Sequence, residues 1–216
     1  MNILKMKEIK LKSSYKGTRI LLGNKKRTLI NKMIDILISQ GFTEIEIPII
    51  QLQETFKNKV GEENNNMMFN FQDRAQRNIC LAPEYTSVIQ QLSKETFKHQ
   101  KDVKVFYVSE CFRGEKPQKG RYRQFTQLGV EVINPTNFED YNPIPISELA
   151  MELLNTLKIN YKVIYDTKRG LDFYLNGLGF EIHCDKLGAS KQVCGGGFYD
   201  RGCGFSIGVD RILPLC

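Results

Sequence analysis

The sequence predicts an α+β fold in which helices flank an antiparallel sheet. Two long strand-like segments, residues 103–112 and 125–133, are separated by a short polar loop, as in a hairpin of neighbouring strands. Few helical segments lie between the strand-like ones, whereas a parallel sheet needs a crossover between neighbouring strands. Short glycine-rich strand-like segments follow, with ten of the 17 glycines at or beyond Gly170. This mixed order is typical of the α+β class.

Three segments have the spacing of helices. Residues 24–40 place six apolar side chains on one helical face, and Gly41 follows as the residue that ends the helix. Residues 86–92 predict a short helix, and residues 148–157 show helical spacing again. The other predicted elements are a strand at residues 44–50, with Pro48 at its end or on a sheet edge, and a polar loop at residues 61–66.

Length and composition favour one globular domain over residues 1–216. Apolar residues make up 41% of the chain and charged residues 25%, which are ordinary values for a globular protein. No apolar run approaches the roughly 18 residues that a membrane-spanning helix needs. The start, MNILKMKEIKLK, carries charges where a secretory signal has an apolar core. We therefore expect a cytoplasmic protein without a membrane segment.

The net charge and the cysteine content do not by themselves decide which partner or metal the protein binds. The net charge of +7 permits a polyanionic partner such as RNA or a nucleotide, although a solvated lysine-rich surface explains it equally well. Six cysteines are too few for a disulfide scaffold in a chain of this length. The spacing of His183, Cys184, Cys194 and Cys203 fits no familiar zinc site, so we expect reduced, partly buried thiols and assign no metal ligand.

The strand at residues 125–133 has two unlike faces, because side chains alternate along a strand. One face carries three aliphatic side chains suited to a core. The other carries an aromatic ring, an amide, a gap at Gly129 and a carboxylate, so it faces either solvent or a ligand. Gln127 and Glu131 lie about 13 Å apart at about 3.3 Å per residue, far enough to hold different parts of one small molecule. The polar face consists of Phe125, Gln127, Gly129, Glu131 and Ile133.

The loop before this strand, RGEKPQKGRYRQ, is strongly basic. Arginine pairs with phosphate through two parallel hydrogen bonds, and a basic loop between two strands can close over a phosphate. A solvated hairpin tip would have the same composition. Because the loop runs directly into the polar face, we interpret the two together as a phosphate-binding loop beside a ligand platform. Its charged residues are Arg113, Glu115, Lys116, Lys119, Arg121 and Arg123.

These residues also carry a family resemblance. The segment YVSECFRGEKPQKGRYRQFTQLGVEVI resembles motif 2 of the class II aminoacyl-tRNA synthetases, and specifically of the histidyl-tRNA synthetases. In family order, GFTEIEIPII resembles motif 1, LAPEYT the amino-acid-binding motif, RGLDFY and GGGFYD two histidine-specific motifs, and GFSIGVDRI motif 3. The resemblance implies a catalytic core with a six-stranded antiparallel sheet. The motif boundaries are about 24–50 for motif 1, about 103–133 for motif 2 and about 204–213 for motif 3.

Position by position, the resemblance implies an ATP site, with Mg²⁺ accompanying the nucleotide. Arg113 would contact the α-phosphate, Glu115 the adenine and Arg121 the distal phosphates. Phe125 and Arg211 would enclose the adenine from its two sides. Fixed arginines suit this chemistry, because they neutralise phosphate charge at any physiological pH. The catalytic residues would be Arg113 and Arg169.

The resemblance also implies contacts to histidine and to the acceptor end of tRNA, and a homodimer formed through motif 1. One group of residues would hold the α-amino group of histidine, a second would surround its imidazole, and a third lies in the motif 2 loop near the RNA. The α-amino group would contact Glu84, Thr86 and Gln127, and the imidazole would contact Glu131, Tyr174 and Tyr199. The residues near the RNA are Lys116, Gln118 and Lys119.

The chain departs from the family pattern in several places. Ala82 stands where the family has Arg, Tyr85 where it has Gly, and Phe173 where it has Tyr. Tyr85 lies between two residues implied to contact histidine, so it either crowds or reshapes the pocket. The spacing between Glu131 and Arg169 leaves no room for the family's insertion domain, and the sequence ends five residues after Arg211, without an anticodon-binding domain. We expect a minimal core, which leaves a role for a separate RNA-binding partner.

Three functions fit this pattern. The first is a synthetase that forms histidyl-adenylate and charges tRNA. The second is a silent paralogue that binds histidine or a protein, as in the regulatory subunit of ATP phosphoribosyltransferase. The third is an enzyme that passes the adenylate to another acceptor. A histidine sensor has no need of the phosphate-binding arginines, and all four are present, which favours the first. They are Arg113, Arg121, Arg169 and Arg211.

Overall fold

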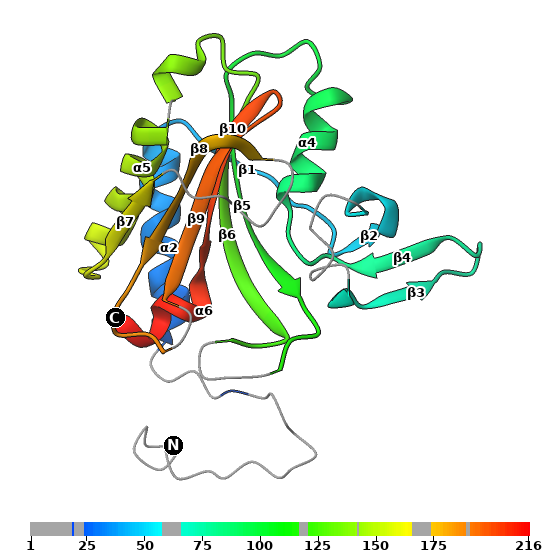
Figure 1. The fold of residues 1–216 in the computed structure, drawn as a ribbon, viewed down its shortest axis with the longest axis horizontal. Coiled ribbons are helices and arrows are strands. Elements are labelled where there is room, and N and C mark those ends of the chain that lie inside the picture. The colour runs from blue at the N-terminus through cyan, green and yellow to red at the C-terminus, as the bar shows by residue number, and fades with distance from the viewer. Residues whose placement is uncertain are drawn as a thin grey trace.

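A seven-stranded sheet forms the centre of the molecule, and a three-stranded sheet stands beside it (Figure 1). The computed structural model describes residues 19, 24–57, 66–116, 121–141, 143–165, 174–188 and 191–216. The large sheet has the order β1-β5-β6-β10-β9-β8-β7 and the small one β2-β4-β3. The strands are β1 (Thr43–Glu44), β2 (Ile50–Leu52), β3 (Asn70–Gln72), β4 (Asn78–Leu81), β5 (Val103–Phe112), β6 (Gln124–Ile133), β7 (Lys162–Tyr165), β8 (Tyr174–His183), β9 (Gln192–Tyr199) and β10 (Gly202–Gly208). The helices are α2 (Lys25–Ser39), α4 (Thr86–Lys94), α5 (Pro143–Thr156) and α6 (Val209–Ile212), with short 3₁₀ turns at Gln53–Thr55, Phe138–Tyr141 and Leu213–Leu215.

The predicted hairpin of two long strands is confirmed. β5 and β6 pair antiparallel along their whole length, from Val103 opposite Ile133 to Phe112 opposite Gln124. The six antiparallel strands that the resemblance implies are present as β5-β6-β10-β9-β8-β7. A seventh strand, β1, joins the edge and runs parallel to β5, so the sheet is mixed.

The single strand predicted at residues 44–50 is wrong. The chain forms β1 in the large sheet and β2 in the small sheet, and residues 45–49 cross from one to the other. The backbone of this crossing still pairs on both sides: the Ile45 N–H donates to the Phe106 carbonyl at 2.9 Å, and the Ala82 N–H donates to the Ile49 carbonyl at 2.8 Å. The alternating apolar residues of this segment thus belong to a crossing whose backbone is bonded to both sheets, and not to one continuous strand.

The three predicted helices are confirmed as α2, α4 and α5. Gly41 ends α2 as expected, with a φ of 81° that other residues rarely adopt. The Phe42 N–H donates to the Leu37 carbonyl at 3.0 Å, and the Gly41 N–H donates to the Ile38 carbonyl at 3.0 Å. This pair of bonds satisfies carbonyls that the end of a helix otherwise leaves free.

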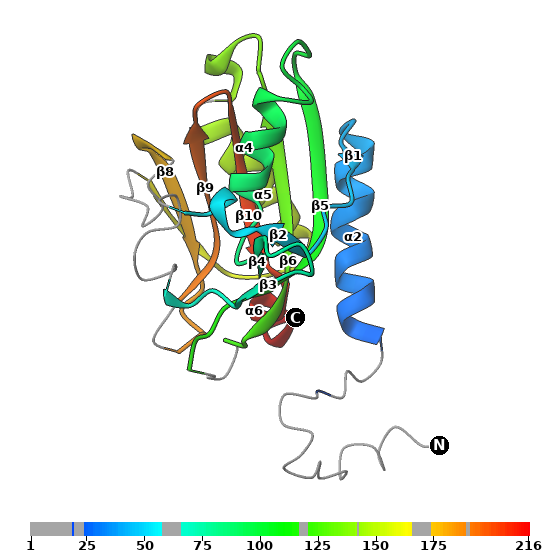
Figure 2. The same ribbon diagram turned by 90° about the vertical axis from the view of Figure 1, so that its right-hand side faces the viewer.

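Two apolar cores lie on opposite faces of the large sheet (Figure 2). Helices α2 and α5 cover one face, where Leu128, Val130 and Val132 of β6 are fully buried, as predicted for the aliphatic side of that strand. Helix α4 and the small sheet cover part of the other face. Five of the six cysteines are buried free thiols, and Cys216 is exposed. In the part of the chain that the structure describes, no helix is both long and apolar enough to cross a bilayer.

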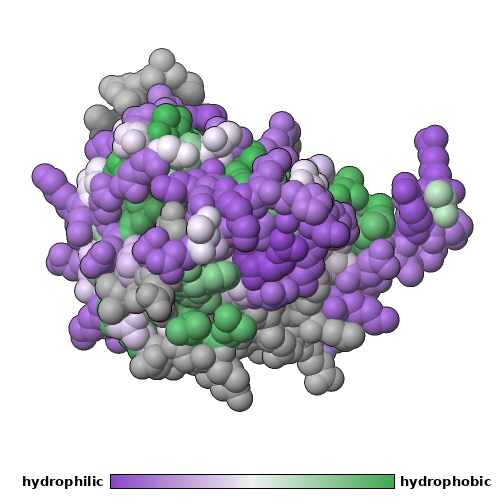
Figure 3. Space-filling model, turned by 90° about the horizontal axis from the view of Figure 1, so that it is seen from above, coloured by the Kyte–Doolittle hydropathy of each residue, from purple (hydrophilic) through white to green (hydrophobic). Residues whose placement is uncertain are grey.

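One face of the small sheet is apolar and largely uncovered. The register aligns Ile50 with Leu81, and Leu52 and Phe71 with Ile79, so all five side chains share one face. Ile50 is 52% exposed, Phe71 43% and Leu52 40%. Seen from above, hydrophobic side chains reach the surface near the base of this projecting sheet (Figure 3).

Candidate active site

The polar face of β6 continues across the neighbouring strands as a surface of very small side chains. Glu131 lies opposite Gly204 of β10, which lies opposite Gly197 of β9. Gly129 is likewise opposite Ser206, and Gln127 opposite Gly208. Because opposite residues in a sheet share a face, these positions form one floor with little side-chain cover. The floor glycines are Gly129, Gly195, Gly197, Gly202, Gly204 and Gly208.

Larger side chains lean over two of these glycines and shape the floor. A Cβ atom at Gly129 would lie 2.0 Å from Cζ of Tyr107, and one at Gly204 would lie 2.1 Å from Oε2 of Glu131. Real Cβ atoms do not approach other atoms so closely. Both glycines are therefore required by the side chains that lie over them, and Tyr107 is part of the wall of the site.

Glu131 is the central group at the closed end of the floor. Its side chain is buried, at 1% exposure, and accepts hydrogen bonds from the Tyr199 hydroxyl at 2.8 Å and the Thr86 hydroxyl at 3.2 Å. Burial raises the pKa of Glu131 from 4.5 to about 8, against the opposing effect of these two donors. The structure thus brings three predicted histidine contacts together around a carboxyl group that holds its proton near neutral pH.

Glu84 and Gln127 complete this end. Glu84 is buried and accepts a hydrogen bond from the Ser87 N–H at 3.2 Å, and its burial raises its pKa. Gln127 is also buried, and its side-chain oxygen lies 2.8 Å from Sγ of Cys111. The predicted amino-acid contacts with described side chains, Glu84, Thr86, Gln127, Glu131 and Tyr199, are all buried. Burial of such groups is expensive unless they are hydrogen-bonded, and each has a polar partner in the protein, so this end forms a closed polar cluster.

Tyr85, the residue that replaces a family glycine, forms part of the wall. Its ring centroid lies 5.1 Å from that of Tyr107. Its hydroxyl donates to the Glu110 carbonyl and accepts from the Ser109 hydroxyl, each at 2.8 Å, which fixes the phenol on β5. Tyr85 therefore reshapes the wall through packing and hydrogen bonds of its own.

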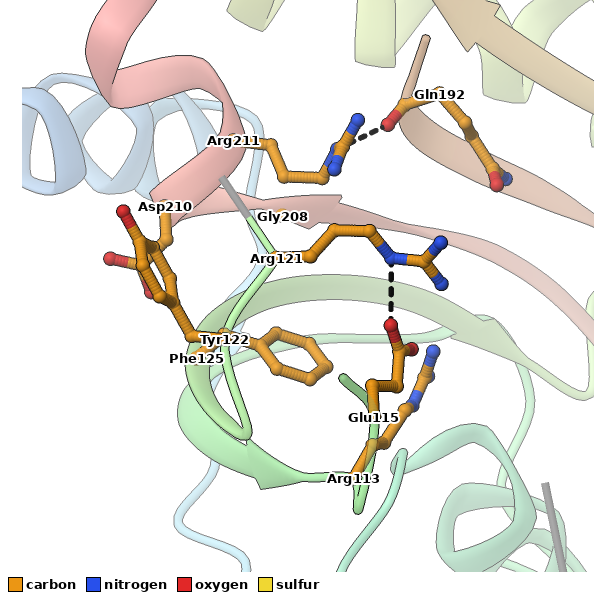
Figure 4. A pocket seen from close by; sticks show the side chains of 9 residues that line it. All are labelled: Arg113, Glu115, Arg121, Tyr122, Phe125, Gln192, Gly208, Asp210 and Arg211. Carbon is orange, nitrogen blue, oxygen red and sulfur yellow. Dashed lines mark hydrogen bonds and ion pairs between the residues drawn. The ribbon is translucent and has the colours of Figure 1, made fainter. Parts of the chain in front are cut away.

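The five predicted ATP contacts lie around one pocket at the open end of the floor (Figure 4). Arg121 and Glu115 form an ion pair at 2.7 Å, and Nε of Arg211 donates to the Gln192 carbonyl at 2.7 Å. Burial and the neighbouring Arg121 lower the pKa of Arg211. Two cationic side chains close to each other favour an anionic ligand. The pocket is lined by Arg113, Glu115, Arg121, Tyr122, Phe125, Gln192, Gly208, Asp210 and Arg211.

Arg113 lies between the two ends of the floor. Its guanidinium carbon is 5.3 Å from the ring centroid of Phe125, on the pocket side. Its Nε donates to the Pro83 carbonyl at 3.0 Å, next to Glu84. Arg113 thus connects the buried end of the floor to the arginine-lined pocket.

Some predicted residues cannot be placed from this structure. Gln118, Lys119 and Arg169 lie outside the described residues, as does most of the loop predicted at residues 61–66, and the side chain of Tyr174 is not described. Lys116 is described and exposed, at the edge of the motif 2 loop. Their predicted roles therefore remain proposals.

Sequence reasoning missed four residues of the site: Tyr107, Tyr122, Gln192 and Asp210. The hairpin register contained a signal for the first, because it sets Tyr107 directly opposite Gly129. Tyr122 lies in the basic loop between two arginines that were predicted. Gln192 contributes through its backbone carbonyl, which no side-chain pattern reveals.

Among the described residues, no cluster of three His, Cys, Asp or Glu side chains could hold a metal ion. His183 pairs with Glu181 at 2.7 Å instead of joining a zinc site. The arginines that line the pocket suit phosphate groups. Mg²⁺ commonly binds through substrate phosphates with few protein ligands, so a phosphate ligand would bring it here without such a cluster.

Comparison with known proteins gives matches over most of the chain. The family model for histidyl-tRNA synthetase matches residues 23–166. A histidine–tRNA ligase of Methanococcus vannielii is 37% identical over 152 residues, which are 68% of this chain and 36% of that relative. The chain thus spans far less than that relative's full length.

Solved structures agree in fold. The apo histidyl-tRNA synthetase of S. aureus matches with a TM-score of 0.71 and 25% identity, covering 96% of this chain and 70% of that one. A protein described as an ATP phosphoribosyltransferase regulatory subunit/histidyl-tRNA synthetase from Bacillus halodurans matches with a TM-score of 0.76, covering 96% and 84%. At 16% identity, the second likeness concerns the fold alone.

Proposed function

Because this chain belongs to the histidyl-tRNA synthetase family, we propose that it activates histidine with ATP and transfers the product to tRNA. One observation carries the proposal: a single glycine-lined floor connects the buried carboxyl group of Glu131 to the arginine-lined pocket. A small amino acid at one end and a nucleotide at the other would meet near Arg113.

In the proposed reaction, a carboxylate oxygen of histidine forms a bond to the α-phosphorus of ATP, and the bond to pyrophosphate breaks. The products are histidyl-adenylate and pyrophosphate. Negative charge grows on the α-phosphate oxygens, and Arg113 is positioned to neutralise it, with Arg169 assigned the same task by the family resemblance. Catalysis of this kind consists mainly of positioning and charge neutralisation. Bound Mg²⁺ would supply further neutralisation on the phosphates.

Selection of histidine would depend on Glu131. Free imidazole has a pKa of about 6.5 and the empty Glu131 a pKa of about 8, so between these values imidazole is neutral and Glu131 is protonated. The complex then holds one proton between two groups that are each able to donate or accept. We expect histidine affinity to be highest between about pH 6.5 and 8, because below that range both groups are protonated and above it neither is, so that no single proton is shared between them.

The proposed RNA contact is the acceptor end of histidine tRNA. Lys116, with Gln118 and Lys119, would lie at the loop next to the nucleotide pocket. Lysine contacts to phosphate act through counterion release, so affinity should be weak and should fall steeply with salt. We expect a short acceptor-stem hairpin with the extra 5′ guanosine to be charged about as well as full-length tRNA. Charging that requires the anticodon would instead indicate a separate RNA-binding partner.

We also propose a homodimer. The exposed apolar face of the small sheet adjoins the crossing segment, where Ile49 is 40% exposed, and this crossing segment lies in the region that resembles motif 1. An obligate interface buries more than about 2,000 Å² and is rich in apolar side chains. Sedimentation at micromolar concentration tests this, and a monodisperse monomer would contradict it.

Histidine-dependent exchange between ATP and pyrophosphate tests the central proposal. The purified chain should catalyse exchange with histidine and not with other amino acids. Tight histidine binding without exchange would favour a regulatory paralogue. Exchange without charging of any histidine tRNA would favour an enzyme with another acceptor.

A further inference from the structure

A buried carboxylate joins three distant parts of the chain behind the nucleotide pocket. The side chain of Asp210, at the start of α6, is 1% exposed. It accepts hydrogen bonds from Arg19 at 2.6 Å, from Nζ of Lys26 at 3.2 Å and from the Thr126 N–H at 2.7 Å. A buried carboxylate is stable only with such partners, and removal of one partner is costly.

Lys26 makes a second contact within this cluster. Its Nζ lies 2.5 Å from the Thr126 hydroxyl, which in turn donates to the side chain of Glu110. The cluster thus holds two carboxylates and two cations, with Glu110 connected to the others through Thr126. The ion pair of Lys26 with Asp210 links helix α2 to helix α6, and the hydrogen bonds of Thr126 extend the cluster to strands β6 and β5.

The local sequence around Lys26 is unfavourable for a helix start. Lys25, Lys26 and Arg27 occupy the first turn of α2, which has no acidic residue and no side-chain cap. Positive charge at a helix N-terminus opposes the helix dipole. A residue that breaks a local rule in this way commonly serves a tertiary contact or a function. For Lys26 that contact is Asp210.

Asp210 stands between the cluster and the nucleotide pocket. It directly precedes Arg211 on α6 and binds the backbone N–H directly after Phe125, and these are the two residues proposed to enclose the adenine. Arg19 adds a contact at the rim, where its guanidinium lies 4.1 Å from the ring centroid of Tyr122, a pocket residue.

We infer that Lys26 is a positioning residue for nucleotide binding. It fixes the carboxylate of Asp210, and this carboxylate sets the positions of both residues that would enclose the adenine. Arg19 supports the same carboxylate from the other side. The inference rests on the proposed function, because the adenine contacts are part of that proposal.

Calorimetric titration with ATP and, separately, with histidine tests the inference on the full chain. Lys26→Met should weaken ATP binding about tenfold and leave histidine binding unchanged, because only the nucleotide end depends on Asp210. Lys25→Met removes the same charge from the neighbouring, exposed position and should change neither affinity. Lys26→Arg should recover most of the ATP affinity, which a general packing defect would not allow.

A double-mutant cycle shows whether Lys26 acts through Asp210. If it does, Lys26→Met combined with Asp210→Asn should bind ATP no more weakly than Asp210→Asn alone. Thermal melts of each variant identify a temperature at which all are folded. Additive losses, or ATP binding by Lys26→Met within about twofold of the unsubstituted chain, would overturn the inference.

The outcomes also separate this inference from the proposed function. A chain that binds ATP, loses affinity in Lys26→Met and catalyses no histidine-dependent exchange would contradict the proposed function and support the inference. A chain that binds no ATP would overturn both.

Discussion

The two ends of the glycine-lined floor hold their polar groups in opposite ways. At the end proposed to bind histidine, Glu131 and Glu84 are buried, and burial raises the pKa of each. At the nucleotide end, charges are partly open to solvent, and the side chain of Arg121 is 41% exposed. The closed end suits recognition of one neutral or singly protonated side chain, since an unpaired partner there is costly. The open end suits a highly charged ligand that brings its own counterions.

The largest expected effect that distinguishes the two ends is the loss of catalysis when Arg113, at the end proposed to bind the nucleotide, is replaced. Arg113→Lys keeps the charge and removes the planar fork that binds two phosphate oxygens. Loss of one such donor typically lowers turnover by about a hundredfold or more. We expect this loss in histidine-dependent pyrophosphate exchange, with histidine affinity nearly unchanged in a direct binding assay. An equal loss of histidine affinity would show that the two ends are not separate.

The next effect concerns Glu131 at the closed end. Its pKa is about 8 in the folded state, against an ordinary value of 4.5, so the folded protein binds this proton more tightly than the unfolded chain does. The empty protein should therefore lose stability as pH rises from about 4.5 to about 8.

Glu131→Gln removes this dependence, because the amide does not ionise. We expect the stability of the variant relative to the unsubstituted chain to rise by about 3–4 kcal/mol between pH 5 and pH 8 in urea unfolding, as a pKa raised from 4.5 to about 8 implies. It should also bind histidine poorly. Glu148→Gln, at an exposed position on α5, is the matched control. Parallel pH profiles for all three proteins would contradict a buried, protonated Glu131.

A smaller effect tests the floor itself. Gly129→Ala would place a Cβ atom 2.0 Å from the ring of Tyr107, which is fully buried and has no space to move away. We expect a loss of about 1–3 kcal/mol in unfolding free energy, as for other overpacked cores. Gly188→Ala, where no atom lies within 4 Å, should be nearly neutral. Tyr107→Leu in the Gly129→Ala background should restore part of the loss.

The smallest effect concerns the wall residue Tyr85. Tyr85→Phe removes two hydrogen bonds and leaves the Glu110 carbonyl and Ser109 hydroxyl without this partner. The expected loss is about 1 kcal/mol in thermal or urea unfolding, with histidine affinity preserved. Tyr161→Phe, which removes an exposed hydroxyl contact to Asn155, should cost less. A large drop in histidine affinity would show that Tyr85 touches the ligand.

Local periodicity explains why part of this molecule was predictable from the sequence. Helix α2 with its stop at Gly41 and the β5–β6 hairpin follow from spacing over a few residues. The two faces of β6 and the basic loop beside it follow in the same way, and these features require no knowledge of distant contacts. The family resemblance, and not periodicity, supplied Glu84, Thr86, Tyr199 and Arg211 at the two ends of the floor.

The features that failed or were missed depend on the three-dimensional arrangement. Residues 44–50 alternate like one strand, but their backbone is shared by two sheets that no local signal separates. The ion pair of Lys26 with Asp210 joins residues 184 positions apart, so periodicity carries no trace of it. The place of Tyr107 over Gly129 depends on the exact register of β5 and β6, whereas the sequence predicts only that these strands form a hairpin.

Because five cysteines are buried and one is exposed, the rate of thiol modification can report on opening of the fold. Burial raises the pKa of Cys80 to about 11 and also raises those of Cys111 and Cys203, so these sulfurs are neither ionised nor accessible. Cys216 is exposed and stands apart from the other five. Partial burial raises the pKa of Cys216 as well, so a thiol reagent should modify it first, and should reach the other five only as the sheet opens. The rate of that slow phase reports how often the layers of this fold separate.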